Sequence, residues 1–193
     1  MPLPLILAST SRYRRDLLQR LGLPFDAVAP DVDEAEHPGE SPAETALRLA
    51  REKAQAVARR YPQAVVIGSD QVAEVKGTRL NKPGTHEAAT LQLGLMSGQR
   101  VHFHSALAVV CHATAQVAVD SVPTVVTLRS LTPEQIERYL RSEEPYDCAG
   151  SAKAEGLGIT LMAAVESSDP TALIGLPLIR LCDLLRPYGY ALP

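Results

Sequence analysis

The sequence is poor in the residues that build cross-links and metal clusters. It has three cysteines in 193 residues, Cys111, Cys148 and Cys182, and no two of them form a CxxC pair. An odd number of widely spaced cysteines is typical of reduced thiols in a cytosolic protein. We therefore expect no disulfide, no structural zinc site and a cytoplasmic location.

Excess positive charge and long apolar runs are also missing. The net charge is -3 and the isoelectric point is near 6.0, so no basic field favours a nucleic-acid polymer as a partner. The apolar residues 3–8 are too few to cross a bilayer and lack the basic flank of a signal peptide. We expect neither a membrane span nor a leader. A small anionic ligand needs only local positive charge, and the composition leaves room for one.

Several familiar catalytic and nucleotide-binding motifs are absent. The chain has no Walker P-loop, no GxGxxG, no GxSxG and no HExxH. These absences speak against a P-loop nucleotidase, a dinucleotide-binding enzyme, an α/β-hydrolase and a zincin protease.

The residues that are present predict one globular α/β domain over residues 1–193. Hydrophobic residues make up 46% of the chain and charged residues 21%, which is enough for an ordinary core. Short β-branched runs alternate with amphipathic segments. We expect strands at 3–8, 25–29, 65–67, 72–80 (a hairpin), 100–111, 116–128 and 159–165, and helices at 11–21, 41–60, 85–96, 130–141 and 176–185.

One acid and one base flank the predicted hairpin. The run 65–67 is expected to deliver Asp70 to the C-terminal end of a strand, where open α/β sheets place their chemistry. Lys82 follows the hairpin, whose turn we place at Lys76 and Gly77. The alternative is that Asp70 caps a turn and Lys82 is an ordinary surface lysine.

Positive charge gathers where a helix is expected to begin. Residues 12–15 read Arg-Tyr-Arg-Arg directly after a serine-rich turn, and cations at a helix N-terminus are unfavourable unless an anion lies between them. This pattern predicts a phosphate cradle, with a solvated arginine face as the alternative. Lys53 lies on the inward stripe of the helix 41–60 and therefore needs a partner.

Acidic residues complete the set. The loop 30–34 carries carboxylates after a strand, which suits a hard divalent cation, although a solvated acidic loop is the commoner case. Cations for phosphate oxygens and carboxylates for a metal ion or water are the means of phosphoryl transfer. The candidate residues are Arg14, Arg15, Lys53, Lys82, Glu34 and Asp70.

Several spaced motifs together resemble the Maf-like nucleoside triphosphate pyrophosphatases over nearly the whole chain. These motifs are LASTSRYRRDLL, VDE, LAREKA, IGSDQV, NKP, AGSAKAEG and GLPLI. The resemblance implies an elongated α/β domain whose mixed sheet forms two lobes around a deep cleft. The forms of the first, central and late motifs are similar to the branch that hydrolyses 7-methyl-GTP. The chain departs from the family pattern at Arg12, where proline is common.

The resemblance also implies roles for individual residues and a cofactor. Asp70 would accept a proton from water, and Glu34 would join it around a divalent metal cation, Mg²⁺ or Mn²⁺. The triphosphate would be held by Ser9, Arg14, Lys53 and Lys82. Residues that differ between branches would set specificity: Tyr13, Gln71 and Glu155.

The chemistry of 7-methylguanine gives these last positions a physical reason. N7-methylation puts a positive charge on the base, which favours stacking on the Tyr13 ring by roughly 0.5 to 2 kcal/mol. Glu155 can accept hydrogen bonds from the guanine N1-H and N2-H, and Gln71 can contact another base edge or the ribose. Alternatively, Tyr13 packs within its helix, in line with Leu17 and Leu21.

The sequence thus predicts hydrolysis of 7-methyl-GTP to 7-methyl-GMP and pyrophosphate, which would remove modified nucleotides from the pool. One alternative is the sister branch that acts on dTTP and UTP. Another is a nucleotide-binding regulator of septum formation without significant turnover. A homodimer is possible, since dimers are common among small enzymes.

Overall fold

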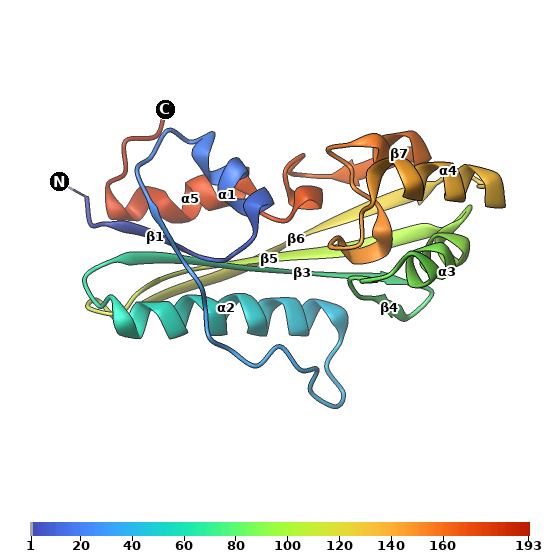
Figure 1. Cartoon of the computed structure of the whole chain (residues 1–193). Coiled ribbons are helices and arrows are strands. Elements are labelled where there is room, and N and C mark those ends of the chain that lie inside the picture. The colour runs from blue at the N-terminus through green and yellow to red at the C-terminus, as the bar shows by residue number, and fades with distance from the viewer. Residues whose placement is uncertain (1) are drawn as a thin grey trace. The chain divides into compact units, whose positions relative to one another are not determined.

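The computed structural model describes residues 2–193 and shows a mixed α/β fold. Its sheet has seven strands in the order β2-β1-β3-β5-β6-β7, with β4 paired to β3 (Figure 1). The chain forms two compact units, and the long strands β3 (Val65–Val75), β5 (Arg100–Cys111) and β6 (Gln116–Leu128) contribute residues to both. The mixed sheet confirms the expected mixed α/β fold class, whereas the two lobes around a deep cleft and the number of domains stay predictions.

Unit 1 contains the described residues up to Gln71 together with Ser105–Val122 and Asp169–Pro193. The strands β1 (Leu5–Ala8), β2 (Asp26–Val28) and the start of β3 run parallel, with Ile6 opposite both Asp26 and Val66. The helices of this unit are α1 (Arg12–Gln19), α2 (Pro42–Arg60) and α5 (Leu178–Leu185).

In unit 1, successive side chains along each strand point to opposite faces of the sheet, and different helices pack on the two faces. Leu7 and Ile67 share one face with the buried leucines of α1 and α5 in a single apolar cluster. On the opposite face α2 approaches so closely that a Cβ on Gly68 would lie 2.2 Å from the carbonyl oxygen of Ala50. Glycine is therefore required at this crossing, and α2 is held tightly against β3.

Helix ends follow the signals in the sequence. Ser11 caps α1 by accepting from the Arg14 amide, and Ser41 forms a capping box with Glu44 at the start of α2. Such caps satisfy backbone donors that have no partner within the helix. The predicted helix 41–60 is thus confirmed at both ends. Among residues 2–193, no helix is both long and apolar enough to cross a membrane.

Unit 2 contains Val72–His104 and Pro123–Ser168. The end of β3 pairs antiparallel with β4 (Thr78–Leu80), and β6 pairs antiparallel with β7 (Met162–Ser167). The turn between β3 and β4 has positive φ at Lys76 and Gly77, as expected for a two-residue hairpin loop. The helices are α3 (His86–Met96) and α4 (Pro133–Glu143).

Three expectations differ from the structure. Asp70 does not end a strand, because β3 continues through the buried Val72 and Val75 and leaves Asp70 in its middle. The apolar pattern of α3 predicts that Ala88, Leu91, Leu95 and Met96 face inward. Met96 is buried as predicted, but Leu91 and Leu95 are 75% and 42% exposed, and the other buried residues of the helix are Ala89 and Leu93. The helix is apolar on both sides, and packing beside α4 selected the second face. The strand expected at 159–165 begins later, because a 3-10 helix occupies Leu157–Leu161.

Candidate functional site

The middle of β3 directs consecutive polar side chains to opposite faces of the sheet. Asp70 has the parity of Gly68 and therefore faces α2, whereas Ser69 and Gln71 have the parity of Ile67. All of Ser69 and nearly all of Asp70 are buried. A buried carboxylate needs a cation or hydrogen-bond donors, and α2 supplies the cation.

Lys53 of α2 lies between two carboxylates. Its Nζ atom is 2.6 Å from Oδ1 of Asp70 and 2.7 Å from Oε1 of Glu34. The side chains of Lys53 and Asp70 are only 6% and 11% exposed, whereas that of Glu34 is 63% exposed. The inward lysine that the helical pattern placed in the core therefore has its partners, and the structure brings three of the predicted site residues together.

Arg14 adds a second cation to this group. Its Nε donates to the carbonyl oxygen of Gly175 at 3.0 Å, which directs the side chain inward from the first turn of α1. Burial lowers the pKa of the Arg14 guanidinium, while the nearby Asp70 and Glu34 carboxylates raise it. Among the arginines of this turn, Arg14 is thus the one beside the acids, and Arg15 is exposed.

The opposite face of β3 is occupied by internal hydrogen bonds. Nε2 of Gln71 donates to Oγ of Ser105 at 2.8 Å and lies within 3.1 Å of the carbonyl oxygens of Ala172 and Leu173. The side-chain amide nitrogen of Gln71 is therefore already used in hydrogen bonds within unit 1. A contact between Gln71 and a substrate, as the sequence predicts, would have to use its side-chain carbonyl oxygen.

Two further predicted residues, Ser9 and Tyr13, lie in the turn before α1 and in its first turn. Ser9 is buried, and its Oγ accepts from the amide of Ser11 at 3.1 Å. The Arg12 guanidinium lies 4.8 Å from the centroid of the Tyr13 ring and donates to its hydroxyl. The ring already has a cation over one face, and Tyr13 is only partly buried, unlike Leu17.

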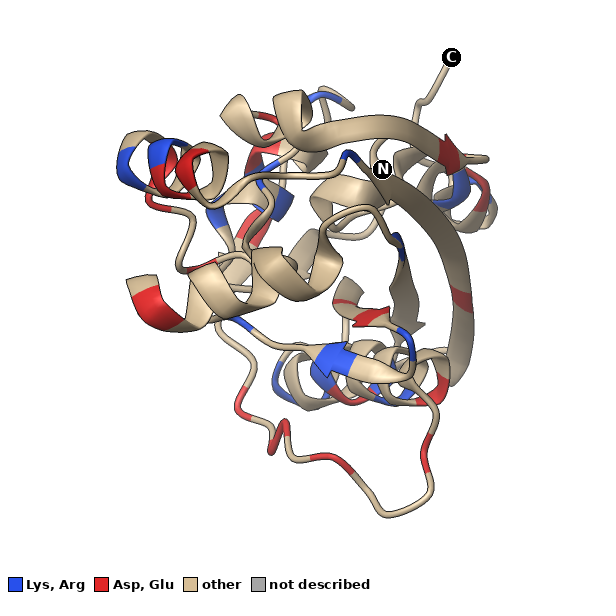
Figure 2. Ribbon diagram, turned by 90° about the vertical axis from the view of Figure 1, so that its right-hand side faces the viewer, with Lys and Arg blue, Asp and Glu red and all other residues tan. Residues whose placement is uncertain are grey.

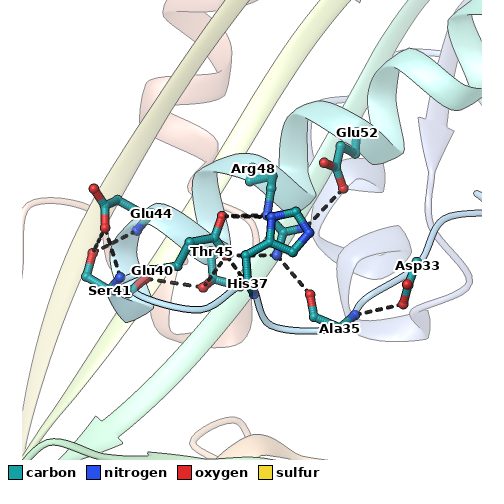
Figure 3. Close-up of polar contacts among 9 residues, drawn as sticks. All are labelled: Asp33, Ala35, His37, Glu40, Ser41, Glu44, Thr45, Arg48 and Glu52. Atoms are coloured by element: carbon teal, nitrogen blue, oxygen red, sulfur yellow. Dashed lines mark hydrogen bonds and ion pairs between the residues drawn. The ribbon is translucent and has the colours of Figure 1, made fainter.

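An acidic loop carries Glu34 to Lys53. Half of the ten residues 31–40, between β2 and α2, are acidic, and none is basic apart from His37 (Figure 2). Arg48 of α2 binds this loop through the carboxylate of Glu40 and the carbonyl oxygen of Ala35 (Figure 3). Nothing in the sequence pattern singled out Arg48 or Glu40, because their pairing spans a loop whose path the sequence does not reveal.

Lys82 belongs to unit 2 and is exposed. Its segment is held by its neighbours: the carbonyl oxygen of Asn81 accepts from Gln92, and the amide of Gly84 donates to the carbonyl oxygen of Tyr146. The backbone on both sides of Lys82 is therefore anchored while its side chain faces outward.

Glu155 also belongs to unit 2, in the glycine-punctuated loop. Glu143 of α4 supports this loop, because its carboxylate binds Nζ of Lys153 and the amide of Leu157 at 2.7 Å. A Cβ on Gly156 would lie 2.7 Å from that carboxylate, so a larger residue there would displace the Glu143 side chain. No sequence motif singled out Glu143, for which the only signal was its place at the end of the helix before the loop.

The residues that could hold a metal ion are Glu34 and Asp70. No group of three or more His, Cys, Asp and Glu side chains within residues 2–193 is arranged to hold one. Two carboxylates nevertheless suit Mg²⁺, which often takes one or two protein carboxylates and completes its shell with water and substrate phosphates. Both carboxylates contact the same ammonium group, so they already converge on one cation.

Comparison with known proteins places the chain in a family. The model of the family "Maf-like protein" matches residues 4–188. The "7-methyl-GTP pyrophosphatase" of Polaromonas sp. (strain JS666 / ATCC BAA-500) is 58% identical, over 98% of this chain and 86% of that protein. The protein of the same name from Burkholderia lata is 57% identical, over 99% and 92% of the two chains. That from Xanthomonas axonopodis pv. citri is 58% identical, over 98% of each. The match over nearly the full length shows that the chain belongs to the Maf-like protein family.

Proposed function

We propose that the protein is a nucleoside triphosphate pyrophosphatase that hydrolyses 7-methyl-GTP to 7-methyl-GMP and pyrophosphate. The name and high identity of the relatives support the substrate. The observation that carries the chemistry is the buried Asp70 carboxylate, held by Lys53 at 2.6 Å beside the Arg14 guanidinium. Such a group has both a base and cations for phosphate oxygens.

In this proposal each charged residue has a distinct task. Asp70 accepts the proton of the water that attacks the α-phosphorus, and Lys53 orients the carboxylate through Oδ1. Arg14 binds phosphate oxygens, with Ser9, directly after β1, as a further contact. Lys82 is proposed to bind the triphosphate as well.

The charge balance of the group supports a need for a divalent cation. Arg14 and Lys53 formally neutralise Glu34 and Asp70, so little positive charge is left for the several negative charges of a triphosphate. Glu34 and Asp70 would hold Mg²⁺ or Mn²⁺, whose contribution when bound is to neutralise charge that develops on the phosphates. The Lys53 ammonium has three donors, so it can keep its contact with Asp70 and also bind a phosphate oxygen.

The specificity residues are proposed from base chemistry. Tyr13 would stack on the cationic 7-methylguanine, and the Arg12 guanidinium over its ring is consistent with an affinity of this ring for cations. Glu155, exposed in its loop, would accept from the guanine N1-H and N2-H. Gln71 would contribute its carbonyl oxygen.

Three coarser features complete the proposal. A cytoplasmic location agrees with three free cysteines. The chain is proposed to act as one domain, and a homodimer would be detected by sedimentation velocity.

The test is pyrophosphate release from 7-methyl-GTP, GTP, dTTP, UTP and CTP at equal concentration with saturating Mg²⁺. We expect 7-methyl-GTP to be hydrolysed fastest. A preference for dTTP and UTP would overturn the specificity argument but keep the catalytic one, and no release from any nucleotide would overturn the proposed function.

A further inference from the structure

The segment that carries Glu34 has no regular secondary structure, yet it ends beside Lys53. Residues 29–37 form neither helix nor strand. The ion pair between Lys53 and Glu34 is weak as an anchor, because the Glu34 side chain is 63% exposed and exposed ion pairs contribute little. Something else must hold this segment against α2.

Arg48 provides that attachment with several hydrogen bonds (Figure 3). Its Nε lies 2.6 Å from Oε1 of Glu40, and its Nη2 lies 2.9 Å from Oε2 of the same carboxylate. Nη2 also donates to the carbonyl oxygen of Ala35 at 2.9 Å, and Nη1 donates to Glu52 at 3.2 Å. One guanidinium therefore ties two points of the loop 31–40 to one turn of α2.

The first of these points is next to Glu34. The carbonyl oxygen of Ala35 is fixed by Arg48, and the amide of Ala35 donates to Oδ1 of Asp33 at 2.9 Å. The peptide groups around Ala35 are thus held, which leaves Glu34 few directions in which its side chain can point. Arg48 holds Ala35, and Lys53 contacts Glu34. Because Arg48 and Lys53 both belong to α2, these two neighbouring loop residues are attached to the same helix.

The chemistry of the contact requires arginine. The planar guanidinium presents donors in a fork that matches a carboxylate and can reach a backbone oxygen at the same time, whereas a lysine ammonium is a point charge on a flexible stem. The pKa of Glu40 is lowered to about 2, chiefly by the hydrogen bonds from Arg48, so the carboxylate stays charged in the working range. The Arg48 side chain is 16% exposed and the Glu40 side chain 19%, so water competes little for the pair.

We propose that Arg48 is a positioning residue, which fastens the loop 31–40 to α2 and thereby keeps the Glu34 carboxylate beside Lys53 and Asp70. The role of Glu34 in turnover rests on the proposed function. The attachment of the loop does not.

The kinetic test compares Arg48→Ala and Arg48→Lys with the control Arg51→Ala. Arg51 is exposed on the same helix and is placed in no site. Loss of a residue that orients another typically lowers activity about 10- to 100-fold, and we expect a fall in this range in kcat/KM on 7-methyl-GTP for both Arg48 variants. The control should stay within about twofold of the wild-type protein.

A double-mutant cycle separates positioning from a general structural role. If Arg48 acts through Glu34, then Arg48→Ala should add no further loss in a Glu34→Ala background. Losses that multiply in the double variant would overturn the proposal, as would an unchanged kcat/KM in Arg48→Ala. Thermal unfolding of each variant identifies any that fails to fold. If Arg48→Ala fails to fold, the kcat/KM of Arg48→Lys decides the proposal.

A second readout does not depend on turnover. Hydrogen–deuterium exchange of the wild-type protein and Arg48→Ala, without nucleotide, should show amides of residues 31–40 exchanging about tenfold faster in the variant, while those in the C-terminal half of α2 do not change. Equal exchange in the loop would overturn the proposal. If the wild-type protein hydrolyses no nucleotide, the proposed function fails, and this measurement alone decides the attachment.

Discussion

Replacing Lys53 by methionine should destabilise the fold, because the buried Asp70 carboxylate loses its ammonium partner. Methionine keeps much of the apolar stem of lysine but removes the ammonium group that lies 2.6 Å from Oδ1 of Asp70. The Asp70 side chain is 11% exposed, so the carboxylate would remain buried without its direct partner. Arg14, whose pKa the Asp70 charge raises, would be the remaining cation nearby.

The size of the effect follows from burial. Removing one partner of a buried ion pair costs about 3–5 kcal/mol, because the other charge is left uncompensated. The lost pair with the exposed Glu34 adds at most about 1 kcal/mol. Since Arg14 offsets part of the loss, we expect Lys53→Met to lower the free energy of unfolding by about 3 kcal/mol. At about 2–4 °C per kcal/mol for a chain of this size, the melting temperature should fall by about 6–12 °C.

The assay is urea unfolding followed by circular dichroism, on four variants and the wild-type protein. Asp70→Asn should cost less than Lys53→Met, because Lys53 keeps its pair with Glu34. The double variant should lose clearly less stability than the sum of the losses in the two single variants, because removing Lys53 no longer leaves a buried charge once Asp70 is neutral. Arg51→Met, exposed on the same helix, should stay within about 0.5 kcal/mol of the wild-type value. A loss below about 1 kcal/mol for Lys53→Met, or strictly additive losses, would refute the reasoning.

Three further predictions concern turnover and pH. Asp70→Asn should abolish pyrophosphate release while circular dichroism still shows a folded protein, and a near wild-type rate would remove Asp70 as the base. Glu155→Ala should lower kcat/KM for 7-methyl-GTP far more than for GTP, and an equal loss on both would count against its contact with the base. The pKa of Glu40 is lowered from 4.5 to about 2, chiefly by Arg48, so its charge contributes stability above pH 4.5 that is lost as the pH falls toward 2. The difference in melting temperature between the wild-type protein and Glu40→Gln should therefore shrink over this interval; His37, 3.7 Å from Glu40, faces the same carboxylate and is present in both.

Local signals in the sequence predicted local structure well. The sequence predicts a capping box from Ser41 to Glu44, a helix cap at Ser11 and a turn at Lys76 and Gly77. All three are present, because each depends on hydrogen bonds or backbone angles within a few residues. The long strands 100–111 and 116–128 were also correct in their bounds. Even the burial of Lys53 followed from helical spacing alone.

Errors arose where two local patterns were equally good or where a strand continued through polar residues. On α3 both faces are apolar, and only packing beside α4 left Leu91 exposed and buried Leu93. At Asp70 the polar triplet resembled a strand end, but its side chains find partners on both faces of the sheet, so the strand continues.

The sequence by itself determined which segments become helices and strands and, through spaced motifs, which family the chain resembles, because these depend on short-range patterns that residue order records. The tertiary structure decided which charges meet. Lys53 lies between Asp70 and Glu34, and Arg48 holds the loop that brings Glu34 there, through contacts between residues from 8 to 19 positions apart in the chain. Such contacts depend on how a loop returns to a helix and how closely that helix approaches a strand, and both are set by packing of the whole unit.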